Sequence, residues 1–484
     1  MTLIIVQYLD LRVDIFSLIG FGSWFIVIGL VVGIWLLHSK TSKILIAVFG
    51  GFLIGIFFLP AFPTIEECPA APPTDGRKTS NLPVYVHIIL DEFTGIEILD
   101  EKIDTQKKLK ESVKNLFIGN GFRLFGRAHS EYADTNDSLT SALNSYRGLH
   151  PDEQYEYDKI NNIYTVTENK YFRYLNAIGY DIRVYQISFL NFCEQSKDII
   201  RYCLTYPAGN ASSQALSQLK EVEKIDLITS KFEILYSKTL LPRIYTHIAG
   251  FTARYGIAMP AWKLPLISDL GPIPVLPVFD QLISDVASGG TGKVYFAHLL
   301  LPHQPYSVDR NCDIRRPVAQ WKKSEIPGLV GGRGNTANSR SERYDDYVDQ
   351  AQCALKKIGE LIEAMKPAGT FENATIIIHS DHGSRIAQLR SRRLNESRLQ
   401  HQDYYDGFSS LFAVKAAHIT PGYDLRMLPI ERLLRHAAGG VLTTPPVTDG
   451  NFVYLREPAP DSTFIKVRMP SIPIASSDSR GGNE

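Results

Sequence analysis

The chain has 484 residues, which is enough for more than one average domain and for a large buried core. It carries 51 basic and 51 acidic residues, so its formal net charge is zero. Proteins that bind nucleic acids normally have a basic excess, so this balance argues against a nucleic-acid partner.

Two uncharged apolar segments near the N-terminus, residues 15–37 and 44–62, are each long enough to cross a bilayer as a helix. The loop between them contains Lys40 and Lys43, which the positive-inside rule places in the cytoplasm. A cleaved signal peptide followed by a buried helix is the alternative, but the first segment is too long and lacks a basic flank. We therefore predict that residues 1–62 anchor the chain in the inner, cytoplasmic membrane, with the remainder on the periplasmic side.

The rest of the chain divides into a proline-rich linker, residues 63–83, and a region in which strands and helices alternate. The predicted strands are residues 84–90, 122–125, 181–186, 294–301, 375–379 and 411–415, and the predicted helices are residues 101–116, 171–178 and 344–365. This alternation predicts an α/β fold, with a mainly parallel sheet sandwiched by helices, over residues 84–470. The polar tail, residues 471–484, is expected to be disordered.

Five cysteines are present, and four of them suit an exported domain. Cys193 and Cys203 could close a small loop, and Cys312 and Cys353 could form a second bridge in an oxidising compartment. Cys68 would then remain unpaired next to the membrane region. Five reduced, buried thiols are the alternative, since spacing alone does not decide the pairing.

The segment 375–385, TIIIHSDHGSR, is the strongest indication of a functional site. A buried strand here ends in Asp381, His382 and Gly383. Open α/β sheets bind their ligands at the carboxyl ends of their strands. A carboxylate and an imidazole in this place suit a divalent metal ion, and the glycine allows a sharp turn.

Two further segments end in polar residues that fit the same site. The strand at residues 84–90 is followed by Asp91 and Glu92, which could be metal ligands, or Asp91 could simply cap a helix. Thr135 precedes a predicted helix, whose positive N-terminal end would favour an alkoxide and a bound anion. Taken alone, Thr135 is better explained as an ordinary helix cap. Thr94 is a second candidate nucleophile, although its place before a glycine is typical of a turn.

A third segment, residues 294–306, places one histidine inside a strand and another beyond it. His298 is expected to be a packed core residue. His303 lies in a loop stiffened by Pro302 and Pro305 and is better placed to contact a substrate oxygen. A group of arginines follows the Asp-His-Gly segment: Arg385, Arg390, Arg392, Arg393 and Arg398. This group could bind an anionic substrate or form a solvated basic surface.

Four motifs follow one another along the chain: strand-Asp-Glu, T-x-x-S-L from Thr135, H-x-P-Y from His303 and S-D-H-G from Ser380. Their order resembles that of the sulfatase-like branch of the alkaline phosphatase superfamily. The chain looks most like the membrane-anchored lipoteichoic acid synthases and phosphoethanolamine transferases of that branch. The resemblance covers residues 83–421, and LFAVKA at residues 411–416 looks like a late core strand of such domains. The C/S-x-P-x-R signature of true sulfatases is absent, so formylglycine chemistry is not expected.

The resemblance implies a role for each of these residues. Thr135 would be the catalytic nucleophile, and His303 would contact the substrate. The implied metal ligands are Asp91, Glu92, Thr135, Asp381 and His382. Zinc or manganese is expected from the family, and magnesium or calcium would also accept such ligands.

The implied function is a membrane-anchored, metal-dependent phosphotransferase or phosphodiesterase that acts on an envelope glycan or lipid carrying phosphate. Thr135 would form a covalent phosphothreonine, which an acceptor hydroxyl or water would resolve. Two alternatives remain open. One is a sulfuric or phosphoric ester hydrolase without transfer, and the other is a non-catalytic envelope scaffold.

Overall fold

The computed structural model describes residues 66–68, 82–144, 150–158, 163–206, 273–315, 337–387, 389–438, 451–457 and 463–474. Within these ranges, no helix combines the length and the apolar character that a membrane span needs. The two predicted membrane segments, residues 15–37 and 44–62, lie outside the described ranges. Membrane anchoring therefore stays a prediction.

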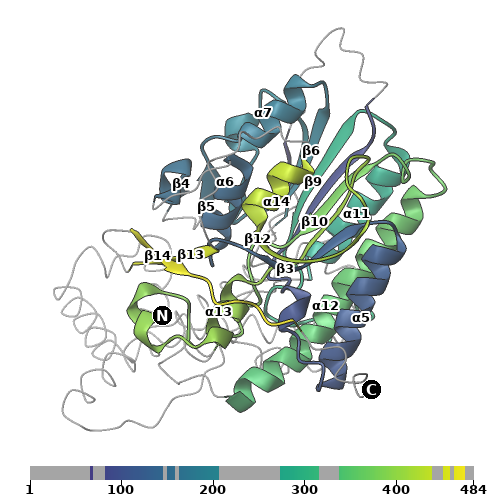
Figure 1. The fold of residues 1–484 in the computed structure, drawn as a ribbon. Coiled ribbons are helices and arrows are strands. Elements are labelled where there is room, and N and C mark those ends of the chain that lie inside the picture. The colour runs from purple at the N-terminus through teal and green to yellow at the C-terminus, as the bar shows by residue number, and fades with distance from the viewer. Residues whose placement is uncertain are drawn as a thin grey trace, which may run out of the picture. The chain divides into compact units, whose positions relative to one another are not determined.

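A nine-stranded sheet, in the order β1-β8-β6-β9-β2-β10-β11-β3-β12, forms the centre of the described part (Figure 1). Its strands are β1 (Glu66–Cys68), β2 (Tyr85–Leu90), β3 (Arg123–His129), β6 (Asp181–Ile187), β8 (Ile200–Tyr206), β9 (Lys293–Leu299), β10 (Thr375–His379), β11 (Phe412–Lys415) and β12 (Gly422–Pro429). β1 and β11 pair antiparallel with their neighbours, and the other neighbouring pairs are parallel. The predicted α/β fold with a mainly parallel sheet is confirmed.

The central strand β2 shows why both faces of the sheet are covered. Val86, Ile88 and Leu90 belong to one hydrophobic cluster, while Tyr85 and Ile89 belong to the other. Successive side chains of a strand point to opposite faces, so a strand that is apolar on both faces must be buried from both sides.

Helices supply the two outer layers (Figure 1). Residues of α5 (Asp104–Gly119), α11 (Val275–Ser288) and α12 (Ala337–Met365) join the first cluster. Residues of α6 (Thr135–Asn144), α7 (Lys170–Ala177) and α14 (Ile430–Ala437) join the second. The predicted helices correspond to α5, α7 and α12, and α12 begins earlier than its apolar pattern suggested because its first turns are polar.

The described part also contains smaller elements. They are the hairpin β13 (Phe452–Arg456) and β14 (Phe464–Arg468), the small sheet of β4 (Tyr155–Asp158), β5 (Ile163–Val166) and β7 (Leu190–Asn191), the helix α13 (His401–Phe408), and the 3₁₀ helices η1 (Ile96–Ile98), η2 (Pro151–Gln154), η3 (Glu194–Ser196) and η5 (Arg393–Arg398). The strand β1 lies within the predicted linker and pairs with β8. The chain stays packed beyond residue 470, because Ile472 is buried against α13 and Ser471 accepts a hydrogen bond from Arg127.

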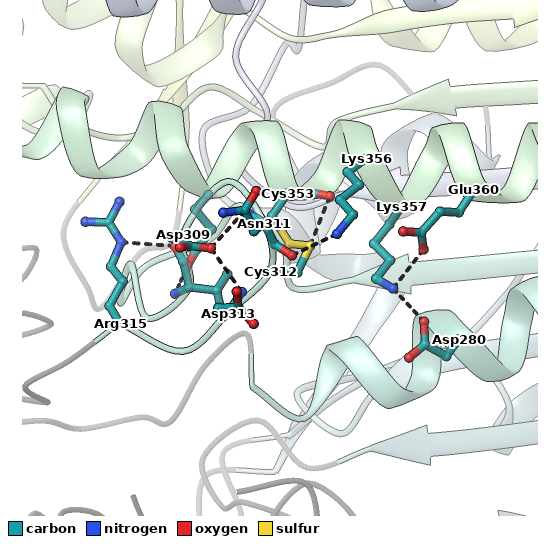
Figure 2. Close-up of a disulfide and its surroundings, with 12 residues drawn as sticks. Asp280, Asp309, Asn311, Cys312, Asp313, Arg315, Cys353, Lys356, Lys357 and Glu360 are labelled. Carbon is teal, nitrogen blue, oxygen red and sulfur yellow. Dashed lines mark hydrogen bonds and ion pairs between the residues drawn. A yellow bond between two sulfur atoms is a disulfide. The ribbon is translucent and has the colours of Figure 1, made fainter. Parts of the chain in front are cut away.

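Both predicted disulfides are present, Cys193–Cys203 and Cys312–Cys353. The alternative of reduced thiols is therefore wrong for these four residues. Cys312 lies in the loop that follows β9, and Cys353 lies in α12, so the second bridge fastens that loop to the helix (Figure 2). Disulfides form and persist in oxidising compartments, which suits the predicted periplasmic placement.

Candidate metal centre and active site

Three adjacent parallel strands deliver the polar residues of the site. Asp91 and Glu92 follow β2, Asp381 and His382 follow β10, and His303 follows β9. β2 pairs with β9 on one side and with β10 on the other. Their carboxyl ends therefore share one edge of the sheet, which is where α/β folds bind ligands.

Asp91, Asp381 and His382 form a buried cluster whose ligand atoms all lie within 4.8 Å of one another. The Nε2 atom of His382 is 3.0 Å from Oδ2 of Asp381 and 3.9 Å from Oδ1 of Asp91. Thr135, the first residue of α6, places its Oγ1 atom 3.1 Å from the same Nε2. The structure thus brings together four residues that the sequence analysis assigned to one site.

The donor set fits a divalent metal ion. Nδ1 of His382 lies 2.9 Å from the carbonyl oxygen of Gly383, so Nδ1 carries the hydrogen and donates it. Nε2 is then left with a lone pair, as in histidines that bind metals. Oδ1 of Asp91 and Oδ2 of Asp381 are buried and accept no hydrogen bond from any described residue. Unpaired buried carboxylate oxygens are costly, and a cation between them would remove that cost.

The pKa values of the cluster point the same way. Burial acts to raise the pKa of Asp381, but the adjacent imidazole of His382 outweighs it and holds this pKa well below its usual range. Burial likewise acts to lower the pKa of His382, but the carboxylates of Asp381 and Asp91 together raise it above its ordinary value. Both directions show that the carboxylates stabilise a positive charge here, whether as a proton on His382 or as a metal ion.

Backbone contacts fix the orientation of Asp381. Its Oδ1 atom accepts hydrogen bonds from the backbone N–H groups of His382, at 2.9 Å, and Glu92, at 3.2 Å. The hydroxyl of Ser138, one turn after Thr135, donates to the carbonyl of Asp381 at 2.6 Å and ties α6 to the end of β10. A Cβ atom on Gly383 would lie 2.5 Å from the carbonyl oxygen of Asp406, so this turn requires glycine.

His298 is a member of the site that sequence reasoning assigned to the core. It is fully buried, as expected, but its Nε2 atom lies 3.2 Å from Oδ2 of Asp91. The imidazole therefore orients the carboxylate whose other oxygen faces His382. The available signal was its position one residue before the end of β9, next to the strand that delivers Asp91.

Glu92, Arg385 and His303 form a second cluster beside the first. Oε1 of Glu92 lies 2.5 Å from Nη2 and 2.6 Å from Nε of Arg385. Nη2 of Arg385 also donates to Nε2 of His303 at 3.0 Å. Asp91, Glu92 and His303 are close enough to hold a cation together, but the guanidinium of Arg385 already supplies a positive charge there. Glu92 as a metal ligand and His303 as a substrate contact stay predictions.

The first turn of α6 is also held in place by the C-terminal hairpin. Oδ1 of Asp137 accepts hydrogen bonds from Nη2 of Arg456 in β13 and from the hydroxyl of Tyr155, both at 2.8 Å. Burial, together with the charge of Asp134, raises the pKa of Asp137 to about 7. These contacts join three elements distant in sequence and keep the N-terminus of α6 pointed at the metal ligands.

The other candidates fall outside this arrangement or at its border. Thr94 is fully buried and its backbone N–H donates to the hydroxyl of Tyr347, whereas the hydroxyl that meets His382 belongs to Thr135. Of the predicted arginine group, Arg385, Arg390 and Arg392 line a pocket next to Asp134, the residue before Thr135. Arg393 pairs instead with Glu457, and Arg398 is exposed in η5.

No protein-family model matches the chain, and no curated protein matches it either. Among solved structures, it is similar to the C-terminal periplasmic domain of EcEptC from Escherichia coli in complex with Zn, with 14% identity over 84% of this chain and 96% of that chain and a TM-score of 0.44. It is also similar to the phosphonate monoester hydrolase SpPMH from Silicibacter pomeroyi, with 12% identity over 78% of this chain and 80% of that chain and a TM-score of 0.43. A third is the putative sulfatase yidJ from Bacteroides fragilis, with 12% identity over 78% of this chain and 77% of that chain and a TM-score of 0.42.

These solved structures belong to the sulfatase-like branch of the alkaline phosphatase superfamily, the group that the ordered motifs resemble. The chemistry of this chain rests on its own residues.

Proposed function

We propose that this protein is a metal-dependent phosphotransferase or phosphodiesterase in which Thr135 is the nucleophile. The observation that supports this most strongly is the 3.1 Å contact between Oγ1 of Thr135 and Nε2 of His382. The same nitrogen faces two carboxylates, each of which has one buried oxygen without a hydrogen-bond partner among the described residues. The nearness of this hydroxyl to the carboxylates supports a nucleophile that acts beside a bound cation.

Asp91, Asp381, His382 and Thr135 would hold the metal ion, for which zinc or manganese is the first expectation. A divalent ion bound there supplies charge that lowers the pKa of the threonine hydroxyl and offsets the negative charge of the reacting ester. The N-terminus of α6 adds its partial positive charge at Thr135.

In the first step, Oγ1 of Thr135 forms a bond to phosphorus while the bond from phosphorus to the leaving alcohol breaks. The proton of Thr135 passes to solvent, and the departing oxygen takes one up. In the second step, an acceptor hydroxyl or water attacks phosphorus, the bond to Oγ1 breaks and Thr135 regains a proton. Transfer and hydrolysis differ only in which hydroxyl resolves the phosphothreonine.

The substrate and the location follow from the rest of the chain. Two predicted membrane segments would keep the site close to lipid-linked molecules outside the cytoplasm, so we propose an envelope lipid or glycan that carries phosphate. A non-catalytic scaffold would have no reason to retain unpaired buried carboxylates beside a hydroxyl. A sulfate ester is the competing substrate, since the ligand set alone does not separate sulfur from phosphorus.

Peptide mass spectrometry of the full-length protein, purified from its native membrane, tests the proposal. A phosphoryl adduct on Thr135, with any attached group visible as extra mass, would support transfer. Turnover of bis(4-nitrophenyl) phosphate with no adduct would favour hydrolysis, and turnover of 4-nitrophenyl sulfate alone would favour the sulfatase alternative. Metal-loaded protein with no adduct and no turnover of either ester would refute the enzyme assignment.

A further inference from the structure

Within the described ranges, the pocket that Asp134 lines contains one arginine whose charge is not balanced. Arg385 pairs with Glu92, and Arg392 binds Asp134 through two contacts of 2.5 and 2.8 Å. Arg390 has no carboxylate partner among the residues that the structure describes, although its side chain lines the same pocket. The pocket therefore keeps a net positive charge after the ion pairs are counted.

The position of the pocket relates it to the reacting group. Asp134 immediately precedes Thr135, and Arg385 lies three residues after His382. Several residues that follow the metal cluster closely in sequence therefore contribute to the pocket: Arg385, Ala387, Arg390, Ser391 and Arg392. A substrate whose ester reaches Thr135 would extend over Arg390.

The three guanidinium groups are close enough to disfavour one another. Arg390 is exposed as a whole residue, but partial burial of its guanidinium, followed by the charges of Arg385 and Arg392, lowers its pKa. Like charges gathered around a concave surface are unfavourable until an anion binds between them. The planar guanidinium group of arginine also matches the oxygens of a phosphate or carboxylate in paired hydrogen bonds.

From these observations we infer that the pocket binds a second anionic group of the substrate, a phosphate or similar oxyanion separate from the reacting ester. Arg390 is the residue that recognises it. This inference rests on the proposed function, since it places the second group on the molecule that Thr135 attacks. It narrows the substrate to one that carries at least one further negative charge near the scissile bond.

Two matched series of substrates test the inference in the metal-loaded, full-length protein. Every substrate is a 4-nitrophenyl phosphodiester with an ethylene, propylene or butylene chain as its second ester group. In one series this chain ends as an alkyl group, and in the other it ends in phosphate. The wild-type protein should prefer the phosphate-terminated diester by about tenfold in kcat/KM for at least one linker, as expected for a hydrogen bond to a charged group. Arg390→Gln should lose most of that preference, and Arg390→Lys should retain part of it.

Arg398→Gln is the control, because Arg398 is exposed, as Arg390 is, but lies outside the pocket. It should keep the wild-type preference. Equal kcat/KM for both series in the wild-type protein would overturn the inference. An unchanged preference in Arg390→Gln would also overturn it, even if kcat/KM falls by the same factor for both series.

A binding measurement separates this inference from the proposed function. Propane-1,3-diyl bisphosphate and propyl phosphate are titrated calorimetrically into the same proteins. Tighter binding of the bisphosphate that depends on Arg390 would support the pocket even if neither diester is cleaved, in which case only the catalytic proposal fails. Equal binding of the two compounds would overturn the pocket whatever the turnover.

Discussion

Glu92 and Arg385 form an ion pair at 2.5 Å, and both have a left-handed backbone, with φ angles of 67° and 52°. This conformation costs a non-glycine residue about 1–3 kcal/mol and persists where the surrounding structure enforces it. Glu92 directly follows Asp91, and Arg385 lies three residues after His382. The two strained residues therefore connect the metal cluster to the arginine pocket, and their pairing fixes the guanidinium between the two.

Glu92→Gln tests whether the Glu92 carboxylate binds the metal ion or only pairs with Arg385. Because its carboxylate contacts Arg385, we expect the variant to keep its metal and to lose activity as Arg385 loses its partner. Metal content is measured by elemental mass spectrometry, and kcat/KM with a phosphodiester. Asp381→Asn, which alters an oxygen of the metal cluster, should lose the metal. Equal metal loss in both variants would instead make Glu92 a ligand, as the family resemblance implies.

Thr135→Val removes the hydroxyl and keeps the shape of the side chain. Turnover should fall below detection, whereas the free energy of unfolding should change by only about 1 kcal/mol, the usual contribution of one hydrogen bond. Thr135→Ser retains a hydroxyl and should retain measurable turnover. Steady-state kinetics and urea unfolding of both variants check this. Comparable activity in the valine and serine variants would remove Thr135 from the mechanism.

The sequence was enough to predict the parts of the fold and site that depend on local pattern. The apolar strand at residues 375–379 and the acids that end β2 and β10 are visible in the sequence, and parallel strand ends must share an edge. The edge strand β12 carries Asp424 and Arg426 among its residues, so it lacks a continuous apolar pattern and was missed.

Side-chain partners brought together by packing were beyond sequence reasoning. His298 and Asp91 are separated by 207 positions, and Arg456 and Asp137 by 319, so no local pattern joins them. The arginine group was recognised from its composition. Which of its members faces a pocket depends on where Asp134, Glu92 and Glu457 lie in space.

The disulfide between Cys312 and Cys353 should affect activity as well as stability. It fastens the loop that carries His303 to α12. Gln350 of α12 holds the same loop, because its side chain donates to the carbonyl oxygens of Pro302, at 3.1 Å, and His303, at 2.7 Å. Lys356 of α12 likewise donates to the carbonyl of Asn311 (Figure 2). Replacing both cysteines with serine should cost about 4 kcal/mol and release the loop.

The Cys193–Cys203 bridge is the matched control, because it closes a shorter segment and joins β8 rather than the active-site loop. Its removal should cost about 3 kcal/mol with a smaller effect on kcat/KM at a temperature where both variants are folded. Urea unfolding and steady-state kinetics provide the two readouts. Equal losses of kcat/KM in the two double variants would contradict a specific role for the loop attachment.

Two buried histidines behind the metal centre should make the fold sensitive to acid. Nε2 of His87 lies 2.8 Å from Nε2 of His379, and Nδ1 of His379 lies 2.8 Å from the carbonyl oxygen of Ser380. Nδ1 of His379 therefore donates to this carbonyl, and its Nε2 faces the imidazole of His87. Burial and the neighbouring imidazole of His379 lower the pKa of His87 well below its ordinary value, and burial lowers the pKa of His379 to about 4.

The sign of the effect follows from these directions. Between the ordinary histidine pKa near 6.5 and the lowered folded values, the unfolded chain binds more protons than the folded one, so stability falls as the pH falls through this window. The loss should approach about 1.4 kcal/mol per pH unit for each histidine. In the double variant His87→Leu, His379→Leu, urea unfolding between about pH 7 and pH 5 should show a smaller loss than in the wild-type protein. His418→Gln, which removes an exposed histidine, should keep the wild-type slope. If the double variant also keeps that slope, the acid sensitivity arises elsewhere, because the two imidazoles would then have the same protonation in the folded and unfolded chain.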